Sequence, residues 1–96
     1  MLSRDRLDQL VDRFNILERR MSAGFGSDEY VALSREYAEL EPLVAKVRAL
    51  SKAEGELADL DQLLADPDTD ADMAALAESE RPALEERVAN LREEIR

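Results

Sequence analysis

The sequence predicts an all-α fold, an elongated antiparallel three-helix bundle in which the helices pack as helical hairpins, in the manner of a coiled coil. The composition indicates long helices, because 45% of the 96 residues are apolar and 38% are charged, with only three Gly and three Pro. The spacing supports the same class, because apolar residues recur at alternating steps of three and four and therefore share one helix face. Aromatic strand formers are scarce.

The first predicted helix covers residues 3–22. Its apolar face consists of Leu7, Leu10, Phe14, Leu17 and Met21. Gly24 follows the helix, and glycine adopts the left-handed backbone conformation that ends many helices. Phe25 comes next, and two readings of it stay open: it folds back over the end of the bundle, or it is an exposed anchor for a partner.

The second predicted helix covers residues 28–65, with Ser27 as its N-cap and Pro67 ending it. Pro42 falls inside the pattern, where we expect a kink rather than a stop. Gly55 lies where the apolar spacing shifts, so it is either a hinge or a site of close helix contact. The apolar face consists of Leu33, Tyr37, Leu40, Val44, Val47, Leu50, Leu57, Leu60 and Leu64. Tyr30 lies beside this face and is also expected to pack in the core.

The third predicted helix covers residues 70–96 and follows a capping-box spacing between Thr69 and Asp72. Pro82 threatens its continuity, so the helix is either continuous or divided into two segments, with Ser79 capping the second. The apolar face consists of Met73, Leu76, Leu84, Val88, Leu91 and Ile95. The pattern still runs at the last residue, which predicts that the native protein continues beyond it.

The short connectors predict antiparallel neighbours within one domain, residues 1–96. The first and third helices would then share the long second helix, with a three-helix core near its middle and two-stranded packing elsewhere. Apolar strips left uncovered in the two-stranded parts could pair between copies, so self-association of the chain stays open.

The net charge of −10 predicts a protein partner rather than a nucleic acid. Nucleic-acid binding depends on cations that displace counterions from phosphates, whereas an acidic surface attracts basic proteins. Cysteine is absent, the N-terminal residues are charged, and no apolar run approaches the length of a membrane span. These features predict a cytoplasmic protein.

The sequence predicts no catalytic residue, no cofactor-binding residue and no metal ligand, and therefore no enzyme. His and Cys are both absent, which leaves carboxylates as the only source of acid–base chemistry. The carboxylates available on the helices are Glu36, Glu39, Glu41, Glu85, Glu86, Glu93 and Glu94. We interpret them as solvated helix faces.

An alternating acidic series between the second and third helices resembles the start of a calcium-binding loop. It consists of Asp66, Asp68, Asp70 and Asp72. The match then fails, because Ala71 stands where the loop needs Gly and Ala77 stands where it needs Glu. We therefore interpret the series as a polar turn between helices, with calcium binding as the weaker alternative.

The segment 33–44, Leu-Ser-Arg-Glu-Tyr-Ala-Glu-Leu-Glu-Pro-Leu-Val, strongly resembles the start of the bacterial peptide chain release factor 1 family. The helix opening Leu-x-x-Leu-Val-x-Arg-Phe at 7–14 and the segment Leu-Leu-Ala-Asp-Pro at 63–67 are also similar to that family. The resemblance covers essentially the whole chain, and its most distinctive block is 37–42.

The resemblance implies the N-terminal helical docking domain of a class I release factor, which directs translation termination at UAA and UAG codons on the ribosome. The family's Gly-Gly-Gln and Pro-x-Thr-type motifs, which serve peptidyl-tRNA hydrolysis and codon reading, match no position here. The implied partners are the stalk base of the large ribosomal subunit and, functionally, the class II release factor. Two alternatives stay open: a free-standing helical coiled-coil adaptor, and a calcium-binding or carboxylate enzyme module.

Overall fold

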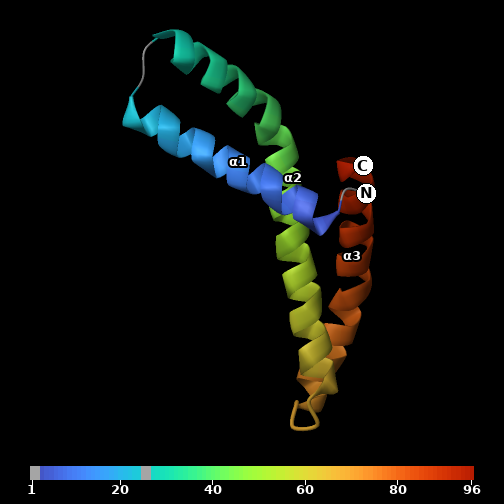
Figure 1. Ribbon diagram of the computed structural model, residues 1–96. Coiled ribbons are helices and arrows are strands. Elements are labelled where there is room, and N and C mark those ends of the chain that lie inside the picture. The colour runs from blue at the N-terminus through green and yellow to red at the C-terminus, as the bar shows by residue number, and fades with distance from the viewer. Residues whose placement is uncertain (1–2, 25–26) are drawn as a thin grey trace. The chain divides into compact units, whose positions relative to one another are not determined.

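A computed structural model describes residues 3–24 and 27–96, without the side chain of Ser27. In these ranges the chain forms helices α1 (Arg4–Ala23), α2 (Ser27–Ala65) and α3 (Ala71–Ile95), and no strand occurs there (Figure 1). The all-α prediction is confirmed, and each helix begins and ends within one residue of the range predicted from the sequence. No helix in these ranges contains an apolar stretch long enough to cross a membrane.

Helix α1 has defined caps at both ends. The Ser3 hydroxyl oxygen accepts a hydrogen bond from the Arg6 backbone N–H at 3.2 Å, which satisfies one of the free donors of the first turn. Gly24 ends the helix with a φ of 84°, a backbone conformation that side chains with a Cβ rarely adopt. The predicted role of Gly24 is therefore confirmed, whereas the two readings of Phe25 lie outside the described residues.

Helix α2 continues through Pro42. Pro42 is exposed, and so is Ala38, whose carbonyl group the proline leaves without a backbone donor. The prediction that the helix does not stop at Pro42 is confirmed, and the predicted kink stays a prediction. The helix begins at Ser27 itself, and the proposed capping by that side chain lies outside the described residues.

The turn between α2 and α3 is closed by its own polar groups. The Asp66 carboxylate accepts a hydrogen bond from the Asp68 backbone N–H at 2.9 Å, and the Thr69 hydroxyl donates to the Leu63 carbonyl at 2.7 Å. The Asp70 carbonyl accepts the first bond of α3, from the Ala74 N–H at 2.9 Å. The capping box predicted at Thr69 is therefore wrong, because that hydroxyl serves the end of α2 and Asp70 occupies the cap position.

Helix α3 is continuous through Pro82, so the alternative with two segments is wrong. The Ser79 hydroxyl donates to the Leu76 carbonyl at 2.7 Å, within the same helix, rather than capping a new one. Buried side chains on both sides of the proline, Ala77 and Val88, fix the two flanking turns in place. Packing therefore compensates for the backbone bond that Pro82 removes.

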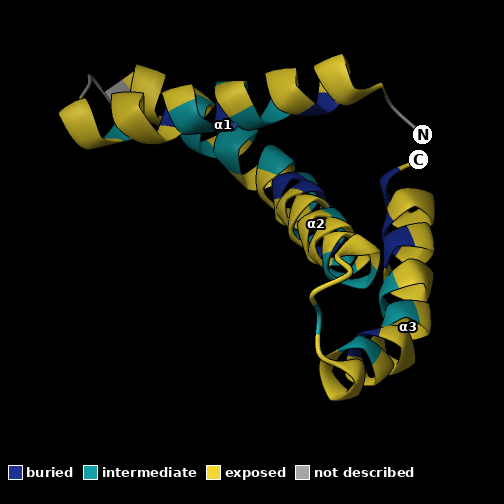
Figure 2. Ribbon diagram, turned by 90° about the horizontal axis from the view of Figure 1, so that it is seen from below, coloured by how far each residue is buried: buried dark blue, intermediate teal, exposed yellow. Residues whose placement is uncertain are grey.

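The helices form two compact units, and α2 contributes to both. The first unit comprises Met1–Val47 with Ile95–Arg96, and the second comprises Arg48–Glu94. In Figure 2 the buried residues are short dark blue stretches of ribbon along otherwise exposed helices. Buried in the first unit are Leu7, Phe14, Leu17, Val44, Val47 and Ile95; buried in the second are Leu50, Ala53, Ala77, Val88 and Leu91. The three-helix core predicted near the middle of α2 stays a prediction.

Three side chains assigned to the apolar faces are instead exposed. Tyr30, Met73 and Leu76 keep 47%, 50% and 54% of their surface accessible. The sequence analysis missed two small core residues, Ala53 and Ala77, each only 2% exposed. Spacing rules favour large apolar residues as core candidates, whereas closely approaching helices place alanines at the contact.

Gly55 lies in open space. A Cβ added at this position would meet no atom within 4 Å, so the alternative of a close helix contact is wrong. Glycine destabilises the middle of a helix because its backbone loses more conformational entropy on folding, and no packing contact at Gly55 offsets this loss. A hinge at Gly55 stays a prediction.

We expect Gly55→Ala to raise the free energy of unfolding by about 1 kcal/mol, because alanine is the stronger helix former and has room here. Urea denaturation measures the change, and slower amide exchange around residue 55 would support the hinge. Gly24→Ala is the matched control and should lower stability by roughly 1 kcal/mol, because it strains the positive φ. An unchanged or lower stability of Gly55→Ala would contradict the expectation.

Candidate functional site

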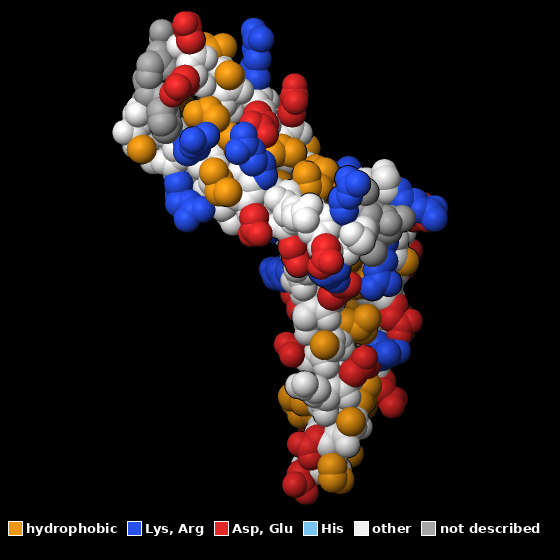
Figure 3. Space-filling model, viewed as in Figure 1, with side chains coloured by type: hydrophobic (Ala, Val, Ile, Leu, Met, Phe, Trp, Pro, Cys, Tyr) orange, Lys and Arg blue, Asp and Glu red, His pale blue; other side chains and the backbone are white. Residues whose placement is uncertain are grey.

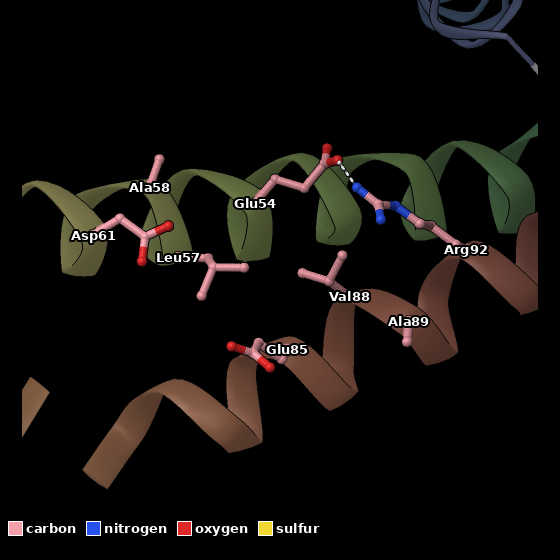
Figure 4. Close-up of a pocket in the computed structure, with 8 residues that line it drawn as sticks. All are labelled: Glu54, Leu57, Ala58, Asp61, Glu85, Val88, Ala89 and Arg92. Atoms are coloured by element: carbon pink, nitrogen blue, oxygen red, sulfur yellow. Dashed lines mark hydrogen bonds and ion pairs between the residues drawn. The ribbon is translucent and has the colours of Figure 1, made fainter. Parts of the chain in front are cut away.

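A groove of about 400 Å³ lies between α2 and α3 in the second unit (Figure 4). Its floor is apolar and its rim carries carboxylates. The lining residues are Glu54, Leu57, Ala58 and Asp61 from α2 and Glu85, Val88, Ala89 and Arg92 from α3. Figure 4 shows the Leu57 and Val88 side chains directed into the space between the helices. The groove is thus an open channel along a helix pair rather than an enclosed pocket.

Two arginines hold the carboxylates of this groove. Arg92 Nη2 donates to Glu54 Oε2 at 2.9 Å, and Arg81 Nε donates to Asp61 Oδ1 at 2.7 Å. Arg81 also binds Glu85 on its own helix. The hydrogen bond from Arg81 lowers the pKa of Asp61, and the bond to Asp61 raises the pKa of Arg81. Arg81 therefore favours the ionised form of Asp61, and the Arg81–Asp61 and Arg92–Glu54 pairs link α2 to α3.

In the first unit, an aromatic pair and an ion pair lie side by side in the sequence and both join α1 to α2. The rings of Phe14 and Tyr37 stack with centroids 4.4 Å apart and an interplanar angle of 22°. Arg13 donates to Glu36 through two parallel bonds, Nε to Oε1 at 2.8 Å and Nη2 to Oε2 at 2.7 Å. The paired bonds fix the geometry more strongly than a single contact does.

The carboxylates that the sequence offered for catalysis do not gather in one place. Glu36 belongs to the Arg13 pair, where the hydrogen bond lowers the pKa of the glutamate. Glu85 belongs to the Arg81 pair. The remaining candidates are exposed on α2 or α3: Glu39, Glu41, Glu86, Glu93 and Glu94. Because Arg13 lowers its pKa, Glu36 is poorly suited to donate a proton near neutral pH.

The acidic turn uses one of its carboxylates internally. Asp66 closes the turn through the Asp68 N–H, and Asp68, Asp70 and Asp72 are exposed. Across residues 3–24 and 27–96, no three acidic side chains come together in an arrangement that could hold a metal ion. The geometry favours the polar-turn interpretation of this series.

Sequence reasoning missed the interhelical ion pairs. The pair within α3, Arg81 with Glu85, has the spacing of four residues that helix rules recognise. The pairs between helices join residues at sequence separations of 20 to 38. Those separations depend on where each helix turns back, which the apolar spacing alone leaves undetermined.

The negative charge is concentrated in the second unit. Residues 48–94 contain 14 acidic and five basic side chains, a net charge of −9, whereas the rest of the chain contains nine acidic and eight basic ones, a net charge of −1. Figure 3 shows red side chains outnumbering blue ones over the lower part of the molecule, which is formed by α2 and α3. The two units therefore present different surfaces to a partner.

The comparison with known protein families decides what these helices belong to. The model of the PCRF domain matches residues 10–96, which is most of the chain: the greater part of α1 and the whole of α2 and α3. The chain belongs to the PCRF domain family. No solved structure matches the chain.

The PCRF domain is a domain of class I peptide chain release factors, so the function of the chain lies in translation termination on the ribosome. The family assignment agrees with the resemblance found in the segment 33–44, which contains Pro42 inside the long helix. This PCRF domain therefore belongs to a protein that works on the ribosome. Its acidic second unit and its α1–α2 pair are features of that protein.

We expect the Arg13–Glu36 pair to stabilise the folded chain near neutral pH and to lose this effect in acid. The folded-state pKa of Glu36 lies below its ordinary value of 4.5, so the contribution is present above that value and disappears as the pH falls through the lowered pKa. The stability difference between the wild type and Glu36→Gln should therefore shrink from pH 7 towards acid. Urea denaturation across pH measures it.

Glu39→Gln is the control for this prediction, because Glu39 is exposed on the same helix. The difference between wild type and Glu39→Gln should change less with pH than the Glu36→Gln difference, because the bonds from Arg13 go to Glu36. If the stability difference between the wild type and Glu36→Gln depends on pH no more than the Glu39→Gln difference does, the ion pair contributes nothing to stability. Many exposed ion pairs behave in this way.

We expect calcium to leave the thermal unfolding of the chain unchanged, because the Asp66 carboxylate already accepts a backbone hydrogen bond. A calcium titration followed by circular dichroism measures this. A melting temperature that rises with calcium and returns after chelation would support the calcium alternative instead.

Proposed function

We propose that this chain is the N-terminal docking domain of peptide chain release factor 1, within a longer protein that directs termination at UAA and UAG codons. The block 37–42 supports this choice within the release factors, because its Tyr-Ala-Glu-Leu-Glu-Pro sequence is the most distinctive part of the resemblance. In this proposal the chain itself is not an enzyme and has no catalytic, cofactor or metal site. Codon reading and peptidyl-tRNA hydrolysis belong to other domains of the longer protein.

The proposed role of the domain is contact with proteins. Its ionisable side chains serve interhelical pairs or exposed surface, and neither His nor Cys is present to act as base, nucleophile or ligand. The net charge of −10 disfavours direct contact with ribosomal RNA. The same charge favours basic ribosomal proteins, which agrees with the stalk base of the large subunit as the docking region.

The class II release factor is the functional partner in this proposal, and the cytoplasm is the compartment, because the ribosome, the release factors and their substrates meet there. The free-standing adaptor remains the rival function. It shares the fold of the docking domain, and it differs in the sequence that follows Arg96.

Sequencing the native reading frame beyond Arg96 tests the proposal first. We expect a Gly-Gly-Gln triplet roughly one hundred or more residues further on, the separation of a following domain. The purified full-length protein should then release peptide from ribosomes programmed with UAA or UAG, and not with UGA. Peptide release at UAA and UGA, rather than at UAA and UAG, would show that the protein is not release factor 1. A reading frame without the Gly-Gly-Gln triplet would favour the free-standing adaptor.

Ribosome binding tests the docking role of the domain itself. We expect the 96-residue chain to co-sediment with large ribosomal subunits and to slow termination by the full-length protein when present in excess, because both compete for one docking region. The chain alone should release no peptide. Co-sedimentation that disappears after the stalk-base proteins are removed would support the named region, whereas unchanged binding would place docking elsewhere.

A further inference from the structure

The start of α3 presents large apolar side chains to solvent. Met73 is 50% exposed and Leu76 is 54% exposed. They lie three residues apart and are therefore adjacent on the helix surface. Asp72 and Glu80 share this face, because Asp72 precedes Leu76 by four residues and Glu80 follows it by four. We call these four residues the acidic apex.

The acidic apex lies within the most negative segment of the chain. Residues 53–86 contain 12 acidic side chains and a single basic one, Arg81. Arg81 is already engaged by Asp61 and Glu85, and Glu54 is bound by Arg92. In the described part of the chain, the other nine carboxylates of this segment form no ion pair. They include both acidic residues of the apex.

We propose that the acidic apex is a docking surface for a basic amphipathic helix of a partner protein, in which an apolar stripe covers Met73 and Leu76 while flanking Lys or Arg side chains meet Asp72 and Glu80. The inference rests on the proposed docking function and names the surface and the chemistry of the partner. Two apolar anchors surrounded by unpaired charges of one sign are the arrangement that such a helix complements.

The charges exclude other occupants. A nucleic acid or an anionic membrane surface would bring phosphates against carboxylates with no cation between them. A second copy of the chain docking apex to apex would place acidic segments of the same sign against each other. A basic helix gains both the burial of two apolar side chains and the neutralisation of unpaired carboxylates.

A synthetic amphipathic peptide with a leucine stripe flanked by lysines is the probe, and fluorescence anisotropy measures its binding to the 96-residue chain. We expect Met73→Ala and Leu76→Ala each to weaken binding about tenfold, the size of a central contact. Asp72→Asn with Glu80→Gln should also weaken binding and reduce its dependence on salt. A peptide of the same composition with the stripe scrambled should bind more weakly.

The matched controls lie on α1. Ile16 is an exposed apolar residue there, and Asp8 and Asp12 are exposed carboxylates. Ile16→Ala and the pair Asp8→Asn with Asp12→Asn should leave peptide binding unchanged. All substituted side chains of the apex are exposed, so circular dichroism should show the helices intact in every variant.

The inference is overturned if the peptide does not bind, if the apex variants bind it as the wild type does, or if the α1 variants weaken it equally. The two proposals fail separately. If the chain does not bind the ribosome but the apex variants weaken peptide binding, only the proposed docking function fails. If the chain binds the ribosome but the apex variants bind the peptide as the wild type does, only the proposal for the acidic apex fails.

Discussion

The fold depends on one long helix that buries apolar side chains of both its neighbours. Neither α1 nor α3 can cover its own apolar face, and the core of each unit combines side chains from α2 with those of another helix. The continuity of α2 is therefore the main constraint on the structure. Pro42 and Gly55 both lie at exposed positions of α2, and the helix continues through them.

The ion pairs add orientation to this burial. Two parallel bonds between Arg13 and Glu36 set the register of α1 on α2 next to the stacked Phe14 and Tyr37 rings. Apolar contacts alone tolerate small rotations and slides of a helix, whereas a two-bond contact between planar groups accepts only a narrow range. Polar contacts at the edge of an apolar seam therefore specify which of several similar packings is adopted.

The helix class and boundaries were predictable from the sequence because they depend on local rules. The apolar spacing, the helix end at Gly24 and the effect of Pro67 all act within a few residues, whereas the N-cap at Ser3 was not predicted. The exposure of Met73 and Leu76 was not predictable in this way, since it depends on where α3 meets α2. The same holds for Ala53 and Ala77, whose small size becomes meaningful only when the second helix is in place. The family assignment came from the match to the PCRF domain and agrees with the resemblance in the segment 33–44.

The isolation of Arg81 among twelve acidic side chains has a consequence for how the second unit responds to ionic strength. Added ions weaken the guanidinium bridge between the helices, and they also relieve the mutual repulsion of the unpaired carboxylates. These two effects on the stability of the unit have opposite signs and offset each other in part, whereas the attraction that the unit exerts on a distant cation only weakens as salt is added. Ionic strength therefore affects the stability of the second unit and its long-range attraction for cations in different ways.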